Sequence, residues 1–145
     1  MKRSIFALVA GLALWVLVAT LLNRGLRAGF PGYALAEPTM TFTLGMKVAR
    51  LIVGALASLA AGAATGRITP SRTGLPWVLG AIILAVFTPI HVQLWAKFPV
   101  WYHLAFLGTL VPLVALGAAL TRNRNSPAER GAKTPANIGH APTVQ

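Results

Sequence analysis

Two histidines of this sequence, His91 and His103, are each six residues from Lys97. If Lys97 lies at the tip of a hairpin of two helices, this equal spacing places both imidazoles at the same depth along the hairpin. Two histidines at one depth can bind a metal ion or a haem iron, or relay protons. We hypothesise that the two imidazoles face each other inside the molecule.

The alternative is that both histidines are separate, neutral side chains that hydrogen-bond to Gln93, Tyr102 or the backbone. Two ligands are few for a metal ion, and no carboxylate or thiol stands nearby in the sequence to complete a zinc site. We therefore expect neither a metal nor a cofactor at this position.

A second candidate is Arg50, which is followed at four-residue spacing by small residues: Gly54, Ser58, Gly62 and Gly66. Residues spaced by four lie on one face of a helix. In a membrane, small residues on such a face let two helix backbones approach closely. This series therefore predicts a helix-packing stripe on which Arg50 also lies.

Two roles are open for Arg50. In a structural role, its side chain extends to the outer lipid headgroups or hydrogen-bonds to helix carbonyls. In a functional role, it points inward and binds an anionic substrate or a lipid headgroup. Glu37, one of only two acidic residues in the chain, is a candidate partner for Lys47 or Arg50.

The residue types that are absent exclude several classes of enzyme. The chain has no cysteine and no aspartate, which removes disulfides, thiolate metal sites and cysteine nucleophiles. It contains no phosphate-binding loop, no HExxH motif and no glycine-rich dinucleotide fingerprint. No apolar segment carries a carboxylate, which counts against the small multidrug-resistance exporters. We expect the protein not to be an enzyme.

The elements that must position these residues are membrane-spanning helices. The chain has 145 residues, of which 56% are hydrophobic and 10% charged, whereas soluble domains carry roughly 25% charged residues. Because a bilayer core needs about 20 helical residues, four stretches qualify as spans: 4–23, 44–66, 75–96 and 99–121. The sequence thus predicts an all-α, integral membrane four-helix bundle in residues 1–121.

The remaining segment, 122–145, is rich in proline, glycine and charge and is expected to be a disordered basic cytoplasmic tail. A cleaved signal peptide is the alternative interpretation of span 4–23. Its apolar stretch is longer than a usual signal core of roughly 7 to 15 residues, so we favour a membrane span.

The basic residues predict the orientation of the bundle. Of the 13 lysines and arginines, eight lie at the amino terminus, in the loop between the second and third spans, or in the tail, and five lie on the opposite side. Because basic residues favour the cytoplasmic side, both termini are expected to be cytoplasmic. The net charge of +11 reflects these flanking residues, and we expect no nucleic-acid partner.

The hairpin segment 89–107, PIHVQLWAKFPVWYHLAFL, resembles a group of uncharacterised small bacterial inner-membrane proteins with four transmembrane helices. The resemblance covers mainly this hairpin and the span that carries the small residues. It implies a multi-pass protein of the bacterial inner, or plasma, membrane and implies no activity.

The leading hypothesis is that the protein is a structural or accessory membrane subunit. We expect it to contact the lipid bilayer and a membrane protein partner or a second copy of itself. The alternative is a small transporter, channel or ligand-binding membrane protein with an outer-facing pocket formed by Arg50, Glu37, His91 and His103, near which Gln93 and Tyr102 are further candidate ligand-binding residues. A third class, a haem-binding electron carrier, would use the two histidines as iron ligands.

Overall fold

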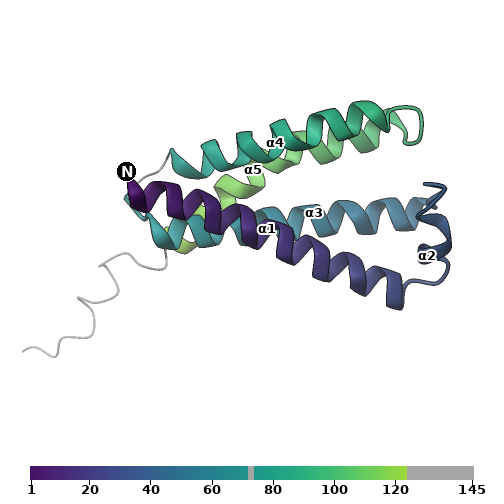
Figure 1. Ribbon diagram of the computed structural model, residues 1–145, viewed down its shortest axis with the longest axis horizontal. Coiled ribbons are helices and arrows are strands. Elements are labelled where there is room, and N and C mark those ends of the chain that lie inside the picture. The colour runs from purple at the N-terminus through teal and green to yellow at the C-terminus, as the bar shows by residue number, and fades with distance from the viewer. Residues whose placement is uncertain (72–73, 124–145) are drawn as a thin grey trace, which may run out of the picture.

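The computed structural model describes residues 1–71 and 74–123. These residues fold into five helices, which Figure 1 labels in chain order: α1 (Lys2–Gly29), α2 (Tyr33–Ala36), α3 (Leu44–Ile68), α4 (Leu75–Gln93) and α5 (Val100–Asn123). Four of them, all except the short α2, are long and apolar enough to cross a membrane. The chain is therefore an all-α, multi-pass membrane protein, and the predicted four-helix bundle is confirmed.

The helix ends differ from the predicted spans. Helix α1 continues past residue 23 to Gly29, because Arg24 and Arg27 have long side chains that are accommodated at an exposed helix end. Helix α4 ends at Gln93, before the predicted end at residue 96, and residues 94–97 form the turn toward α5. Helix α5 continues through residues 122 and 123, which had been assigned to the tail. The rest of the expected disordered tail, 124–145, lies outside the described residues.

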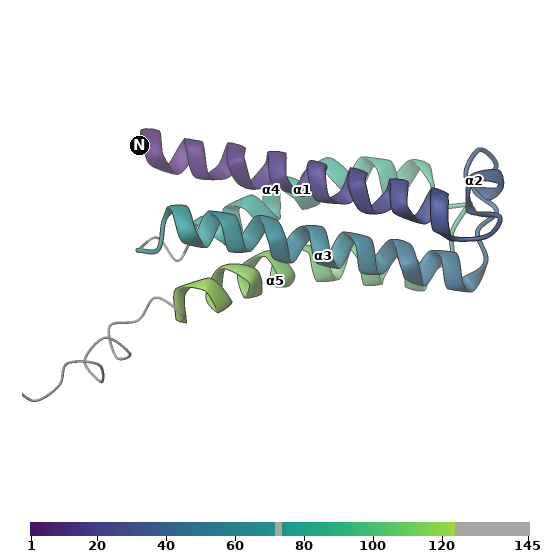
Figure 2. The same ribbon diagram turned by 90° about the horizontal axis from the view of Figure 1, so that it is seen from below.

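Helix α3 is the centre of the bundle. It packs along α1 on one side and along α5 on the other, and α4 packs on α5. Figure 1 shows that the α1–α3 pair and the α4–α5 pair diverge toward the end that carries α2. Figure 2 shows that the first residue of α1 and the last turn of α5 lie at the opposite end.

The predicted small-residue stripe of α3 is the surface that packs against α5. All four of its small residues are buried. A side chain at Gly62 would collide with the backbone of Val114, and one at Gly66 would come within 2.9 Å of the Ala118 backbone. Gly117 of α5 lies in the same way against the backbone of Leu59. The two backbones therefore approach as closely as the stripe predicts, because glycines face the partner helix from both sides.

Two apolar clusters hold the bundle together. The inner cluster joins all four long helices through residues that include Trp15, Ala57, Leu79, Phe106 and Val114. The outer cluster fixes the connection between α1 and α3 onto the hairpin of α4 and α5; its buried residues are Tyr33, Ala36, Phe42, Met46, Phe98 and Tyr102. Helix α2 therefore has a defined place over one end of the bundle, near Arg50.

Candidate functional site

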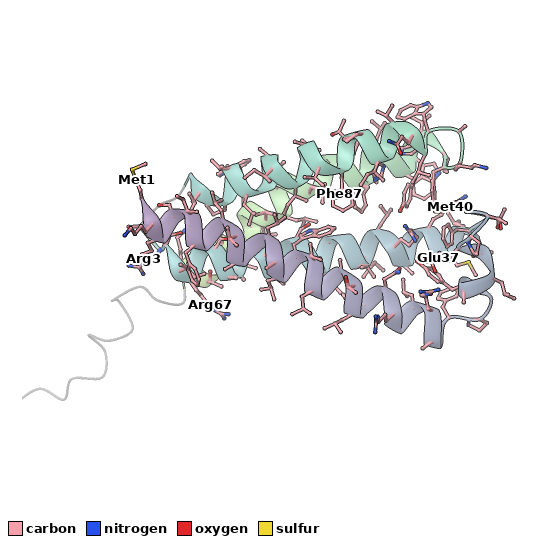
Figure 3. All side chains as sticks on the ribbon, viewed as in Figure 1. Met1, Arg3, Glu37, Met40, Arg67 and Phe87 are labelled. Carbon is pink, nitrogen blue, oxygen red and sulfur yellow. The ribbon has the colours of Figure 1, made fainter. Side chains whose placement is uncertain are left out.

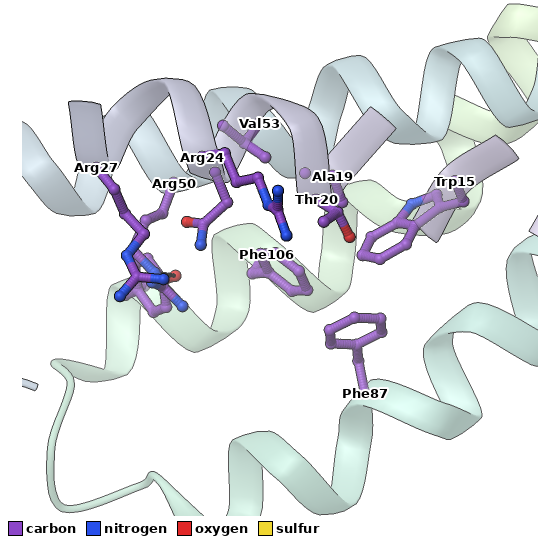
Figure 4. A pocket seen from close by; sticks show the side chains of 12 residues that line it. Trp15, Ala19, Thr20, Arg24, Arg27, Arg50, Val53, Phe87 and Phe106 are labelled. Atoms are coloured by element: carbon purple, nitrogen blue, oxygen red, sulfur yellow. Dashed lines mark hydrogen bonds between the residues drawn. The ribbon is translucent and has the colours of Figure 1, made fainter. Parts of the chain in front are cut away.

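A cleft of about 450 Å³ lies where the two helix pairs diverge. Its volume is in the range of small-molecule sites, roughly 300–1,000 Å³. Four helices line it, through Trp15, Ala19, Thr20, Asn23, Arg24, Arg27, Arg50, Val53, Gly54, Phe87, Tyr102 and Phe106. Figure 4 shows three arginines toward one end of the cleft and the aromatic rings of Trp15 and Phe87 at the other. We call it the arginine cleft.

Arg50 is held in this cleft by two tyrosines from different parts of the chain. Its Nη1 donates a hydrogen bond of 2.9 Å to the Tyr33 hydroxyl, and its Nε donates one of 3.4 Å to the Tyr102 hydroxyl. The guanidinium carbon lies 4.7 Å from the ring centroid of Phe42, a cation–π distance. The expected bonds to helix carbonyls are absent among the described residues, because the aromatic outer cluster surrounds the guanidinium instead.

Tyr33 links Arg50 to α1. Its hydroxyl donates to Asn23 Oδ1 at 2.8 Å while it accepts from Arg50. Burial raises the pKa of Tyr33 above its usual value, although the Arg50 charge opposes this shift. The hydroxyl therefore stays protonated at neutral pH and keeps both hydrogen bonds. Neither Tyr33 nor Asn23 could be found from the sequence, since no spacing relates either residue to Arg50.

Glu37 pairs with Arg27 and not with Lys47 or Arg50, so both candidate pairings were wrong. Its Oε2 lies 2.9 Å from Arg27 Nε, and its Oε1 accepts a 3.4 Å hydrogen bond from Asn23. The physical reason is that α2 carries Glu37 back over the end of α1. This is the one ion pair within residues 1–71 and 74–123, so Arg50 has no carboxylate partner in the described part of the chain.

His91 and His103 meet as hypothesised. Their Nδ1 atoms are 2.8 Å apart and their rings are nearly perpendicular, at 81°. A contact of this length requires that one Nδ1 carries a hydrogen and the other accepts it. The His91 ring stacks on Phe106 and the His103 ring on Trp95. The pair therefore forms a buried link between α4 and α5.

A small cavity of about 70 Å³ adjoins the histidine pair, and Arg50 also lines it. A metal ion bound to both Nδ1 atoms would have to break their hydrogen bond and would lie near the Arg50 guanidinium, which repels cations. For the two Nδ1 atoms, the geometry therefore favours a hydrogen bond between the imidazoles over a shared metal ion.

Two members of the expected outer-facing pocket lie elsewhere. Gln93 is exposed at the end of α4 and lines neither the arginine cleft nor the small cavity. Glu37 also lies outside both linings. Arg50 and Tyr102, in contrast, line both spaces, which makes them the connection between the cleft and the histidine pair.

No protein-family model, curated protein or solved structure matches this chain. The arginine cleft has three guanidinium groups, two tyrosine hydroxyls nearby and an apolar floor. Such a set of groups is suited to hold an anion at the end of a mostly apolar cleft.

Proposed function

We propose that the protein is a non-enzymatic, multi-pass membrane protein that binds an anionic ligand in the arginine cleft. This is the ligand-binding alternative among the functions expected from the sequence. The observation that carries it is the Arg50 guanidinium, which two tyrosine hydroxyls hold in the cleft while no described carboxylate pairs with it.

The charge of the cleft supports this proposal. Arg24, Arg27 and Arg50 line it, and of these only Arg27 has a carboxylate partner within the described residues. A guanidinium has five N–H donors, and Arg50 uses two of them on tyrosines. Positive charge at membrane depth is costly when it has no partner. An anion would supply that partner and accept the remaining hydrogen bonds.

The accessory-subunit interpretation has less support. The exposed apolar side chains of the four long helices, such as Val9, Leu17, Ile52 and Leu104, are those that lipid covers in any multi-pass protein. They do not distinguish a protein partner from lipid. We retain contact with a membrane partner or a second copy as a prediction from the sequence alone.

The location and orientation follow from the charge distribution and from the hairpin resemblance. We propose a bacterial inner membrane with both termini in the cytoplasm, so that the arginine cleft lies in the outer half of the bilayer. A ligand would then reach the cleft from the outer side of the membrane or from the outer lipid leaflet.

Ligand binding can be tested on protein purified in a neutral detergent and freed of lipid. The probes are inorganic phosphate and dodecyl phosphate, and calorimetry measures their affinities. We expect at least one probe to bind the native protein, and Arg50→Gln to weaken that binding about tenfold or more, because a charge-assisted hydrogen bond contributes about 1.5–3 kcal/mol.

The matched control is Arg67→Gln, which removes an exposed arginine from the other end of the same helix. This variant should bind both probes as the native protein does. The proposal is wrong if neither probe binds the native protein, or if Arg50→Gln and Arg67→Gln bind equally well.

A further inference from the structure

We infer that the ligand of the arginine cleft is a membrane lipid with an anionic phosphate headgroup, held with its headgroup at the arginines and its acyl chain against Trp15 and Phe87. This inference rests on the proposed anion-binding function and names the class of ligand. Four observations carry it. The lining of the cleft changes from apolar to cationic along its length, and its two ends lie at the bilayer depths of acyl chains and headgroups. The cleft is also accessible from the side that lipid covers, and its lining is positively charged.

The gradient is clearest on α1. Trp15, Ala19, Asn23 and Arg27 recur every four residues and all line the cleft, so they form one face of the helix. This face changes from apolar to cationic over a rise of about 18 Å, at 1.5 Å per residue. A ligand that fills it must itself be apolar at one end and anionic at the other.

The other helices repeat this gradient in the same direction. On α3 the lining changes from Arg50 to Val53, and on α5 it changes from Tyr102 to Phe106. Phe87 of α4 points toward α1 and α3 (Figure 3) and closes the apolar end together with Trp15, whose ring centroid is 4.8 Å away. A small soluble anion would use only the arginine end and would leave the apolar half without a ligand.

The two ends of the cleft match the layers of a bilayer. Arg50 is six residues from the start of α3, or about 9 Å along the helix axis, and Arg24 and Arg27 lie in the last two turns of α1. These cations are therefore near the boundary of a hydrocarbon core about 30 Å thick, where lipid phosphates lie. Trp15, about four turns from the end of α1, lies at the depth of the acyl chains.

The cleft is accessible from the side. Helix α1 packs mainly on α3 and makes a smaller contact with α4. Thr20 and Arg24 line the cleft and are exposed, so the rim on α1 faces the surface that lipid covers. Since the helix pairs diverge toward the outer end (Figure 1), a lipid can enter between α1 and α4 without leaving the bilayer.

The charge favours an anionic headgroup over a zwitterionic one. Three arginines line the cleft, and the nearby Glu37 carboxylate offsets one of them. Arginine binds phosphate oxygens through two parallel hydrogen bonds. The same arginines would repel the quaternary ammonium group of a zwitterionic headgroup.

The contribution of the acyl chain can be measured with the two probes in neutral detergent. We expect dodecyl phosphate to bind the native protein at least tenfold more tightly than inorganic phosphate. Ala19→Trp, which fills the apolar half of the cleft, should remove most of this difference. Ala13→Trp adds the same bulk at an exposed position of α1 and should behave as the native protein.

Thr20→Trp provides the same test if Ala19→Trp does not fold, because Thr20 is an exposed residue on the rim. Two results would show that the acyl chain does not use the cleft. One is equal affinity of the native protein for inorganic and dodecyl phosphate, and the other is a full difference retained in Ala19→Trp and Thr20→Trp. In either case the lipid inference is wrong while anion binding stands. If neither probe binds at all, the proposed function itself fails.

The headgroup is tested with native mass spectrometry of protein from bilayer nanodiscs that contain equal amounts of phosphatidylglycerol and phosphatidylcholine. We expect retained phosphatidylglycerol to exceed phosphatidylcholine severalfold, and Arg24→Gln to reduce this preference without disturbing the tyrosine contacts of Arg50. Equal retention of the two lipids by the native protein would overturn the assignment of an anionic headgroup.

Discussion

At the scale of residues, several polar side chains within the helices find hydrogen-bond partners inside the bundle. Arg50 bonds to tyrosine hydroxyls, His91 bonds to His103, and the Thr65 hydroxyl donates to the carbonyl of Ala61 one turn earlier. Such pairing is required because lipid offers no hydrogen bonds. Two of these groups keep unused capacity: Arg50 has further donors at the lining of the arginine cleft, and His103 Nε2 is buried without a hydrogen-bond partner within the part of the chain that the structure describes.

The histidine pair yields a prediction about stability. His91→Phe and His103→Phe preserve an aromatic ring for the stacking with Phe106 and Trp95 but remove the hydrogen bond. Each single variant should lose about 1–3 kcal/mol of stability, because the remaining imidazole has a buried nitrogen without its partner. The double variant should lose less than the sum, with a coupling of about 0.6 kcal/mol or more.

Unfolding of the two single variants and the double variant in detergent measures this coupling. Gln93→Ala changes an exposed polar residue of the same helix and should leave stability unaltered. Strictly additive losses in the two histidine variants would mean that the imidazoles do not interact.

At the scale of elements, α3 determines the packing of the bundle, since it touches α1 on one face and α5 on another. Its close approach to α5 depends on glycines from both helices, as Gly62 faces the Val114 backbone and Gly117 faces the Leu59 backbone. In a membrane, this approach gains van der Waals contact that lipid tails cannot supply equally well.

Gly62→Leu should therefore destabilise the bundle by about 1–3 kcal/mol, because the two backbones must separate to admit the side chain. Gly108→Leu is the matched control in α5, since a side chain at Gly108 would meet nothing within 4 Å. Thermal unfolding in detergent compares the two variants. If their stabilities are equal, the α3–α5 interface does not depend on small residues.

At the scale of the whole molecule, the two ends of the bundle differ in composition. Arg3 and Arg67 lie at the end that carries the amino terminus, whereas Glu37 lies at the other end, as Figure 3 shows. Arg3 also donates to the carbonyl of Ile68 at the carboxyl end of α3. The arginine cleft opens at the end of the bundle that carries Glu37. The orientation of the chain therefore decides which leaflet the cleft faces.

The orientation predicted from the basic residues is testable with a reporter enzyme that is active only outside the cytoplasm. Fused after Thr121, the reporter should be silent; inserted near Gly32, in the exposed turn before α2, it should be active. The reverse pattern would place the cleft in the cytoplasmic leaflet. Arg122→Gln combined with neutralisation of Arg124, Arg130 and Lys133 should give mixed orientations, because the tail supplies half of the basic residues on that side.

The sequence by itself determined the features that depend on local properties. Hydropathy and length specified four membrane helices, four-residue spacing specified the buried face of α3, and equal spacing from Lys97 specified the common depth of the two histidines. These features follow from the rise and the period of a helix and from the thickness of a bilayer, so no knowledge of the neighbouring helices is needed.

Only the tertiary structure decided which side chains meet. Helical period fixes the depth of a residue, but the rotation of each helix against its neighbours fixes its direction, and that rotation depends on the packing of the whole bundle. The chain path between α1 and α3 decided that Glu37 pairs with Arg27 and that Tyr33 reaches Arg50. The arginine cleft is likewise a feature that only the tertiary structure decides, because residues from four separate helices together enclose it.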